Sequence, residues 1–208
     1  MVSTTFALRG PQDAWYLDRE VGISELPGFY HPRGLDILPN GTTFIADTNN
    51  HGISIVDQNG TFLKRWGVHG SGDGQLNSPY DLEVSSNEVY VVDQSNHRIQ
   101  VFDHNGTFKR KWGSYGTANG QFRTPRAIAI DYNGTSVSEV FVADWDNHKV
   151  QIFDENGTFK RSIGSYGSAN EHIQYASGVE IGPDNLVYIS SRNQQKIKVF
   201  EHNGTYVR

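Results

Sequence analysis

The sequence predicts an all-β fold built from about four copies of one small unit, and three observations support this prediction. Nearly the same words recur as "DQNGTFLKRWGVHG" from Asp57, "DHNGTFKRKWGSYG" from Asp103 and "DENGTFKRSIGSYG" from Asp154, and a shorter echo, "EHNGTYVR", ends at Arg208. Each copy contains runs rich in β-branched and aromatic residues that are separated by turn residues. No helical period is visible in the sequence.

Each unit contains four predicted strands. In the second unit these are "PYDLEV" from Pro79, "EVYVVD" from Glu88, "HRIQVF" from His97 and "GTFKRKWG" from Gly106. The units begin at Pro32, Pro79, Pro125 and Ala176, so their spacings are 47, 46 and 51 residues. This is the range of β-propeller blades, which are four-stranded antiparallel sheets. We therefore predict one propeller domain over residues 1–208, which is either a full ring or part of a larger one. Its blades are expected at about 31–78, 79–124, 125–175 and 176–208, after an opening fourth strand and linker in 1–30.

The repeated "DxNGTF" words are predicted to form the hairpin between the third and fourth strands. Asn-Gly is typical of a type I′ turn, which needs positive φ at both central residues. The fourth strand is then the outer edge of its blade, where cations discourage pairing with a foreign strand. The cations are Lys64, Arg65, Lys109, Arg110, Lys111, Lys160 and Arg161. A nucleic-acid stripe is the alternative interpretation, which the net charge of -5 disfavours.

The units resemble the NHL repeat family in "DTNNHGISIVD", "DQSNHRIQVFD", "DWDNHKVQIFD" and the weaker "SRNQQKIKVFE", and also in the joint "GSYGTANGQFRTP". This resemblance implies a β-propeller, commonly of six blades, that serves mostly as a recognition platform. A minority of related propellers are lyases or hydrolases, and some NHL relatives recognise RNA. The fourth unit departs from the signature, with Ser190 expected in place of the Asp and Gln194 in place of the His.

The recurring histidines His51, His97 and His148 are a weak metal signal, because each occupies the same place in a different blade and ligands must converge on one ion. We expect instead that Asp47, Asp93 and Asp144 accept hydrogen bonds within the turns while each His packs beside them. No catalytic residue, metal or cofactor is predicted, and the absence of cysteine excludes thiolate chemistry. Paired carboxylates stay open as an alternative, among Asp36, Asp81, Glu83, Asp131 and Glu180 on the inner strands.

The residue after each unit's first position differs where its neighbours are uniform. Arg33, Tyr80 and Arg126, with Ser177 in the fourth unit, are expected to cluster around the mouth of the central channel. Arg and Tyr are enriched at binding hot spots. Trp145 could join them, from the turn where the other units are aligned with Thr48, Gln94 and Ser191. The alternative is that Arg33 and Arg126 pair with nearby Asp groups.

Six of the seven Asn-Gly pairs are followed by Thr, which makes the N-glycosylation sequon. The sequons are at Asn40, Asn59, Asn105, Asn133, Asn156 and Asn203. Two of them, Asn40 and Asn133, lie in a different turn of the unit, so repeat duplication alone does not explain them. They favour an extracellular or cell-surface glycoprotein, with a cytoplasmic protein as the alternative. No apolar run is long enough to insert into a membrane.

These features favour a non-enzymatic propeller that binds a protein or glycan, or builds a structural assembly. A propeller-type lyase or hydrolase is the alternative, and RNA recognition is less favoured. The opening "TTFALRG" aligns with the fourth strands, whereas the last unit ends soon after its hairpin begins. We therefore expect head-to-tail association of copies, with an uncovered blade face that bears Val187, Ile189, Ile197 and Val199.

Overall fold

A computed structural model describes residues 28–133 and 136–208, which form four antiparallel sheets in sequence order. The first sheet contains β1 (Pro32–Ile37), β2 (Thr43–Asp47), β3 (Gly52–Val56) and β4 (Phe62–Trp66). The second contains β5 (Pro79–Val84), β6 (Val89–Asp93), β7 (Arg98–Phe102) and β8 (Phe108–Trp112). The third contains β9 (Pro125–Asn133), β10 (Ser136–Asp144), β11 (Lys149–Phe153) and β12 (Phe159–Ile163), and the fourth contains β13 (Ala176–Ile181), β14 (Val187–Ser191) and β15 (Lys196–Phe200). The predicted opening strand at Thr4 to Gly10 lies outside the described residues.

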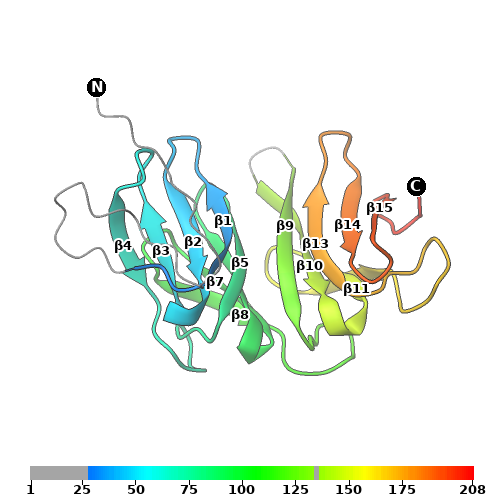
Figure 1. The fold of residues 1–208 in the computed structure, drawn as a ribbon, viewed down its shortest axis with the longest axis horizontal. Coiled ribbons are helices and arrows are strands. Elements are labelled where there is room, and N and C mark those ends of the chain that lie inside the picture. The colour runs from blue at the N-terminus through cyan, green and yellow to red at the C-terminus, as the bar shows by residue number, and fades with distance from the viewer. Residues whose placement is uncertain (1–27, 134–135) are drawn as a thin grey trace.

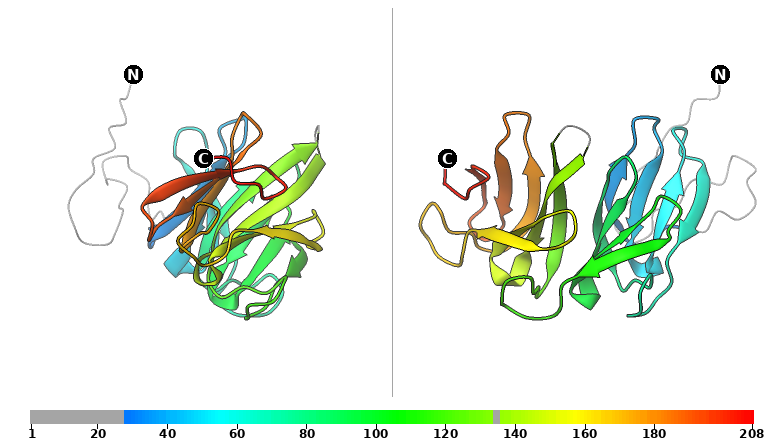
Figure 2. Two further views of the ribbon diagram at one scale, coloured as in Figure 1. Left: turned by 90° about the vertical axis from the view of Figure 1, so that its right-hand side faces the viewer. Right: turned by 180° about the vertical axis from the view of Figure 1, so that it is seen from behind.

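The first strands of the sheets, β1, β5, β9 and β13, lie nearest the middle of the molecule, and later strands lie further out (Figure 1). Each of these inner strands contacts the inner strand of the next sheet. The side and rear views show the sheets turned relative to one another (Figure 2). This is the arrangement of propeller blades, and the predicted fold class is confirmed.

Short 3-10 turns join the second and third strands of three blades: η1 (Thr48–Asn50), η2 (Gln94–Asn96) and η3 (Trp145–Asn147). They lie at one end of the strands, and the hairpins between first and second strands lie at the other (Figure 1). Because the strands alternate in direction, the hairpins between third and fourth strands share the end of the first hairpins. Within the described residues, every helical turn is three residues long, far too short to cross a membrane.

The core consists of three apolar clusters, one between each pair of successive blades. Leu82 and Val84 of β5 pack against the first blade and are 1% and 8% exposed. The corresponding residues of β1, Leu35 and Ile37, are 56% and 55% exposed because no described blade precedes them. The described blades therefore form an arc with an uncovered face at its first blade.

The apolar face expected at the last blade was assigned to the wrong residues. Val187 and Ile189 are completely buried because they face the third blade, and Val199 is also buried. Ile197 alone among the four is exposed, at 62%, on the face that points away from the third blade. The prediction of an uncovered face thus holds for Ile197 and is wrong for the other three side chains.

The third-to-fourth-strand hairpins occur where predicted, but their turn type differs. Gly60, Gly106, Gly157 and Gly204 have positive φ, whereas the preceding asparagines do not. The amide of Gly60 donates to Asp57 O, and the Asp57 carboxylate accepts from the amides of Asn59 and Thr61. This is a type I turn followed by a left-handed glycine, and the type I′ prediction was wrong because the Asp side chain organises the turn instead.

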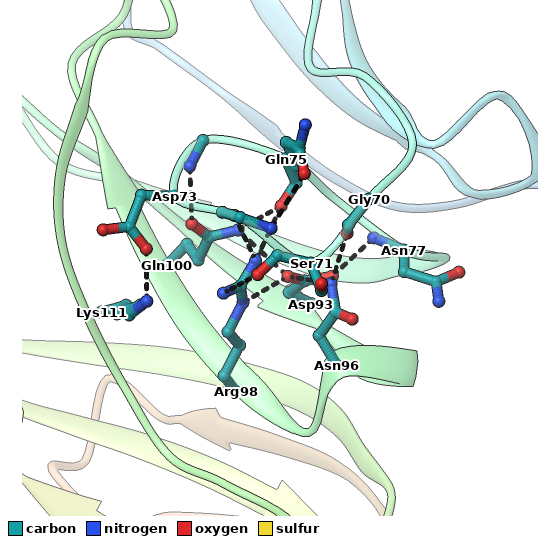
Figure 3. A network of polar contacts seen from close by, with 12 residues as sticks. Gly70, Ser71, Asp73, Gln75, Asn77, Asp93, Asn96, Arg98, Gln100 and Lys111 are labelled. Atoms are coloured by element: carbon teal, nitrogen blue, oxygen red, sulfur yellow. Dashed lines mark hydrogen bonds and ion pairs between the residues drawn. The ribbon is translucent and has the colours of Figure 1, made fainter.

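A buried carboxylate closes each 3-10 turn, as Figure 3 shows for the second blade. Asp93 is completely buried and accepts hydrogen bonds from Arg98 Nε at 2.7 Å, Asn96 Nδ2 at 2.9 Å and Gln100 Nε2 at 3.0 Å. It also accepts from the Asn77 amide, at 2.7 Å, in the linker that leads into the blade. The carboxylate therefore ties the turn, the third strand and the incoming linker together, as expected for the repeated Asp.

The fourth blade keeps this arrangement with different residues. Ser191 pairs with Lys196 as Asp93 pairs with Arg98, and Ser191 Oγ accepts from the Gln174 linker amide at 2.9 Å. Gln195 takes the left-handed conformation that His97 has in the second blade, with φ of 54° in both. The expected replacements at Ser190 and Gln194 were thus one residue too early, since strand register and not local similarity sets the correspondence.

We predict that Asp93→Ala lowers the free energy of unfolding by about 3–5 kcal/mol, because it leaves the buried Arg98 guanidinium without its charge partner. The control is Asp73→Ala, which removes a half-exposed carboxylate that pairs with Lys111 at the surface and should cost at most about 1 kcal/mol. Urea titration followed by tryptophan fluorescence measures both values. Equal losses in the two variants would contradict the role given to the buried carboxylate.

Candidate binding site at the channel mouth

The predicted mouth residues Arg33, Tyr80, Arg126 and Trp145 come together in the structure. Arg33 Nη1 donates to Tyr80 Oη at 3.0 Å, and its guanidinium carbon lies 4.5 Å from the centre of the Tyr80 ring. The guanidinium of Arg126 lies 3.6 Å from the Trp145 ring and 5.6 Å from that of Tyr80. These side chains come from three blades, because the second residue of each inner strand points to the same mouth.

A fifth residue of this cluster, Arg192, was missed. Its guanidinium lies 5.2 Å from the Trp145 ring. Arg192 directly follows Ser191, so it corresponds to Thr48, Gln94 and Trp145, the position that had been given to Ser191 itself. An alignment shifted by one residue would have found it. Ser177 lines the same cavity but its hydroxyl is hydrogen-bonded to Ser190 Oγ at 2.8 Å.

The three guanidinium groups of this arginine cluster (Arg33, Arg126 and Arg192) have no carboxylate within 4.0 Å among the described residues. Burial lowers the pKa of Arg126 and outweighs the opposite effects of Tyr80 and of the more distant Asp146, while the neighbouring charges of Arg192 and Arg33 lower the pKa further. Arg126 Nε is buried and has no hydrogen-bond partner among the residues that the structure describes. Within residues 28–133 and 136–208, neither Arg33 nor Arg126 therefore forms the ion pair with an Asp that the alternative expects.

The outer strands of the second and third blades carry cations that are paired with carboxylates. On the outer strand of the second blade, Lys109 and Arg110 contact Glu88 at 2.9 Å and 2.7 Å, and this pairing lowers the pKa of Glu88 to about 2. In the third blade, Lys160 and Arg161 contact Glu139 in the same way. Arg123 and Lys196 also lack a carboxylate within 4.0 Å among the described residues, so the mouth is distinguished by three such cations that lie close together.

Behind the mouth is a cavity of about 500 Å³, lined by the inner strands of all four blades. Carboxyl groups of Asp81, Glu83 and Glu180 line it together with the mouth residues Arg33, Tyr80 and Arg126. Asp81 Oδ1 occupies the space beside Gly34, where an added Cβ would lie only 1.9 Å away. A glycine at position 34 is what admits this carboxyl group between two blades.

The carboxyl groups in the cavity are hard to ionise. Burial raises the pKa of Asp81 to about 6. Burial, together with the nearby Asp36, Glu180 and Asp81, raises the pKa of Glu83 to about 9. Asp131 is not part of this group, because it accepts a hydrogen bond from Ser138 Oγ and lies 3.7 Å from His202. Of the five carboxylates predicted on inner strands, Asp81, Glu83 and Glu180 therefore line the cavity, and Asp36 lies close enough to raise the pKa of Glu83.

The turn histidines join blades. His51 Nδ1 accepts from the amide of Ser78, and His148 Nδ1 accepts from the amide of Tyr175, both at 3.0 Å. His97 Nδ1 lies 2.7 Å from the carbonyl oxygen of Arg123. Each histidine therefore contacts the linker that enters the next blade. Among the described residues, no group of three or more His, Asp or Glu is placed to hold a metal ion.

The sequons lie at the opposite end of the strands from the arginine cluster. Asn40 is in the β1–β2 hairpin, and Asn59, Asn105, Asn156 and Asn203 are in the hairpins that follow third strands. These five asparagines are exposed. Asn133 ends β9, at the same end of the strands, and its side chain lies outside the described residues. The sequons and the arginine cluster thus lie at opposite ends of the blade strands.

Four sheets fanned around a cavity define a β-propeller, and comparison with known proteins specifies which kind. The family model described as "6-bladed beta-propeller" (DUF5128) matches residues 73–138 and 136–208, and the chain belongs to this family. It is 36% identical over 58 residues to RING finger protein nhl-1 of Caenorhabditis elegans and 30% identical over 73 residues to Protein brain tumor of Drosophila melanogaster. This distant homology confirms the resemblance to NHL repeats. The aligned stretches cover 28% and 34% of this chain but only 6% and 7% of those proteins.

Solved structures show the same fold. A streptogramin B lyase matches with a TM-score of 0.65 and 17% identity, over 85% of this chain and 53% of that one. An auxiliary nutrient binding protein from Bacteroides thetaiotaomicron matches with a TM-score of 0.64 and 13% identity, over 80% of this chain and 46% of that one. The chain thus spans about half the length of these propellers, and the likeness concerns the fold alone.

We predict that stability falls as pH rises from 6.5 to 9, because folded Glu83 keeps its proton up to about pH 9 whereas the unfolded chain releases it near the ordinary value of 4.5. Over this range the folded state binds more protons, so raising the pH favours unfolding. Glu83→Gln should remove most of this slope, and the exposed Glu155→Gln should leave it unchanged. Thermal melts at several pH values test this, and a slope retained in Glu83→Gln would contradict it.

Proposed function

We propose that this propeller is a non-enzymatic recognition module that binds a protein or glycan partner at the channel mouth. The observation that carries the proposal is the convergence of Arg33, Arg126 and Arg192 on Tyr80 and Trp145, with no carboxylate partner among the described residues. Placing like charges together costs stability unless another group compensates them, so such clusters mark functional sites. Arg, Tyr and Trp are also the residues that dominate binding energies.

The test separates the mouth from the turns that hold it. Peptide and glycan arrays probed with the chain should give hits that Arg126→Ala weakens at least ten-fold. His97→Ala should lower the free energy of unfolding by about 1–3 kcal/mol, because it removes a hydrogen bond between blades, and should leave binding by the folded fraction unchanged. Binding that persists in Arg126→Ala, or that is lost in a fully stable His97→Ala, would reverse these roles.

We also propose that the protein is extracellular or displayed on a cell surface, with glycans on the face that carries the sequons. The exposed asparagines at hairpin tips support this, because N-glycosylation requires accessible loops. Glycans at that face would leave the arginine cluster accessible at the other. The partner would then approach from the side of the 3-10 turns.

Intact-mass measurement on protein from its native source, before and after treatment with a peptide N-glycosidase, tests the glycan proposal. We expect a mass above that of the bare polypeptide, and a shift to the bare mass after treatment. Peptide mapping should then place the modification among the five exposed sequons. A native mass equal to that of the polypeptide would refute it.

A lyase or hydrolase activity is the second candidate, and the buried carboxyl groups favour it. Glu83, with its pKa raised to about 9, could donate a proton at neutral pH, while Asp81, at about 6, could accept one. The fold shared with a streptogramin B lyase is consistent with this candidate. Turnover of a ligand found on the arrays, abolished by Glu83→Gln, would favour the enzyme over the recognition module.

A further inference from the structure

We propose that the arginine cluster at the mouth binds a carboxylate of an acidic peptide segment. This inference rests on the proposed recognition function and specifies the ligand. Guanidinium groups are planar forks whose N–H groups match the two oxygens of a carboxylate. The guanidinium carbons of Arg126 and Arg192 lie 3.6 Å and 5.2 Å from the centre of the Trp145 ring, and neither group donates a hydrogen bond to another described residue.

The aromatic rings are unsuited to stacking a sugar or a nucleic-acid base. Trp145 is only 8% exposed, and the Tyr175 ring lies 5.1 Å from it in addition to the two guanidinium groups. Tyr80 is half-buried beneath Arg33. Recognition of single-stranded nucleic acid uses open aromatic faces for the bases, and these rings offer none that is free. The cluster is thus built for a group that accepts hydrogen bonds.

The charge behind the mouth selects among anions. Asp81, Glu83 and Glu180 line the same cavity as Arg33 and Arg126, and Glu180 is exposed to solvent. Glu83 keeps its proton at neutral pH, so the negative charge behind the mouth comes from Asp81 and Glu180. Each further negative charge on a ligand would be repelled by these two carboxylates, and a polyanion also meets a chain whose net charge is -5. A carboxylate carries one negative charge, whereas a phosphate monoester carries about two. The cavity therefore favours a carboxylate over a phosphate.

Among the molecules that could supply this carboxylate, a peptide fits the mouth best. Arg33 and Arg192 are exposed and belong to the first and fourth blades, so the cluster spans the mouth and is open to a chain that lies across it. An extended peptide can place one acidic side chain among the three guanidinium groups while its neighbours stay in solvent. A sugar acid would need contacts to its ring, which the covered aromatic faces do not supply.

Fluorescence anisotropy with a labelled glutamate-rich hexapeptide tests this inference, with its glutamine counterpart as the matched control. We expect the glutamate peptide to bind at least ten-fold more tightly than the glutamine peptide, and Arg126→Gln to abolish that difference. Arg126→Lys, which keeps the charge but lacks the planar fork, should retain only part of it. Lys109→Gln loses one positive charge on the outer strand and should bind as the native chain does.

Arg33→Gln, at an exposed side chain, gives the same test should Arg126→Gln fail to fold. Three further probes distinguish other ligands: a phosphoserine peptide, a glucuronate oligosaccharide and oligouridine. Tighter binding of any of these than of the glutamate peptide, lost in Arg126→Gln, overturns the inference but leaves the recognition function in place. If neither arginine variant changes the binding of any of these probes, the recognition function is overturned as well.

Discussion

The rest of this structure depends on the hydrogen bonds that hold each linker between two blades. The buried Asp93 accepts from the amide of Asn77, and His51 of the preceding blade accepts from the amide of Ser78. Pro79 and Tyr80 follow directly, so the linker is fixed from both sides immediately before its mouth residue. Before Arg126, Asp144 accepts from the amide of Arg123, and His97 Nδ1 contacts the carbonyl oxygen of that residue, so this linker is held from both sides as well. The repeated turn therefore sets the position of the binding residues without contacting a ligand itself.

This division of labour explains how one scaffold carries both uniform and variable positions. Residues that join blades are repeated because each blade must solve the same packing problem, and the completely buried Asp47, Asp93 and Asp144 show how strictly it is solved. Residues at the mouth face the channel and are not needed to join one blade to the next. The result is a set of repeated supports around a cluster of cations, which suits recognition because side chains that are already held lose little conformational freedom on binding.

Much of this architecture could be predicted from the sequence, because repeated sequence segments indicate repeated strands and turns. Arg33, Tyr80 and Arg126 were expected to meet from one repeat position, and Trp145 from a second position in the turn. The geometry brings these four together, whereas their role in binding stays a proposal. Arg192 was missed because a one-residue shift in a divergent turn is invisible without strand register. The high pKa of Glu83 was also beyond prediction, since it arises from burial and from carboxyl groups that three different blades bring together. Burial of Val187 depended on which side of a strand faces a neighbour, and the sequence pattern left that open.

The central claim is that the mouth arginines await an anionic partner while the outer-strand arginines already have one. Nuclear magnetic resonance of the arginine Nε–Hε groups, recorded while the glutamate-rich hexapeptide is added, tests it most directly. The account predicts that the signals of Arg33, Arg126 and Arg192 shift together, while those of Arg110 and Arg161, already paired with Glu88 and Glu139, stay in place. Shifts confined to Arg110 and Arg161, with the mouth signals unmoved at saturating peptide, would contradict it.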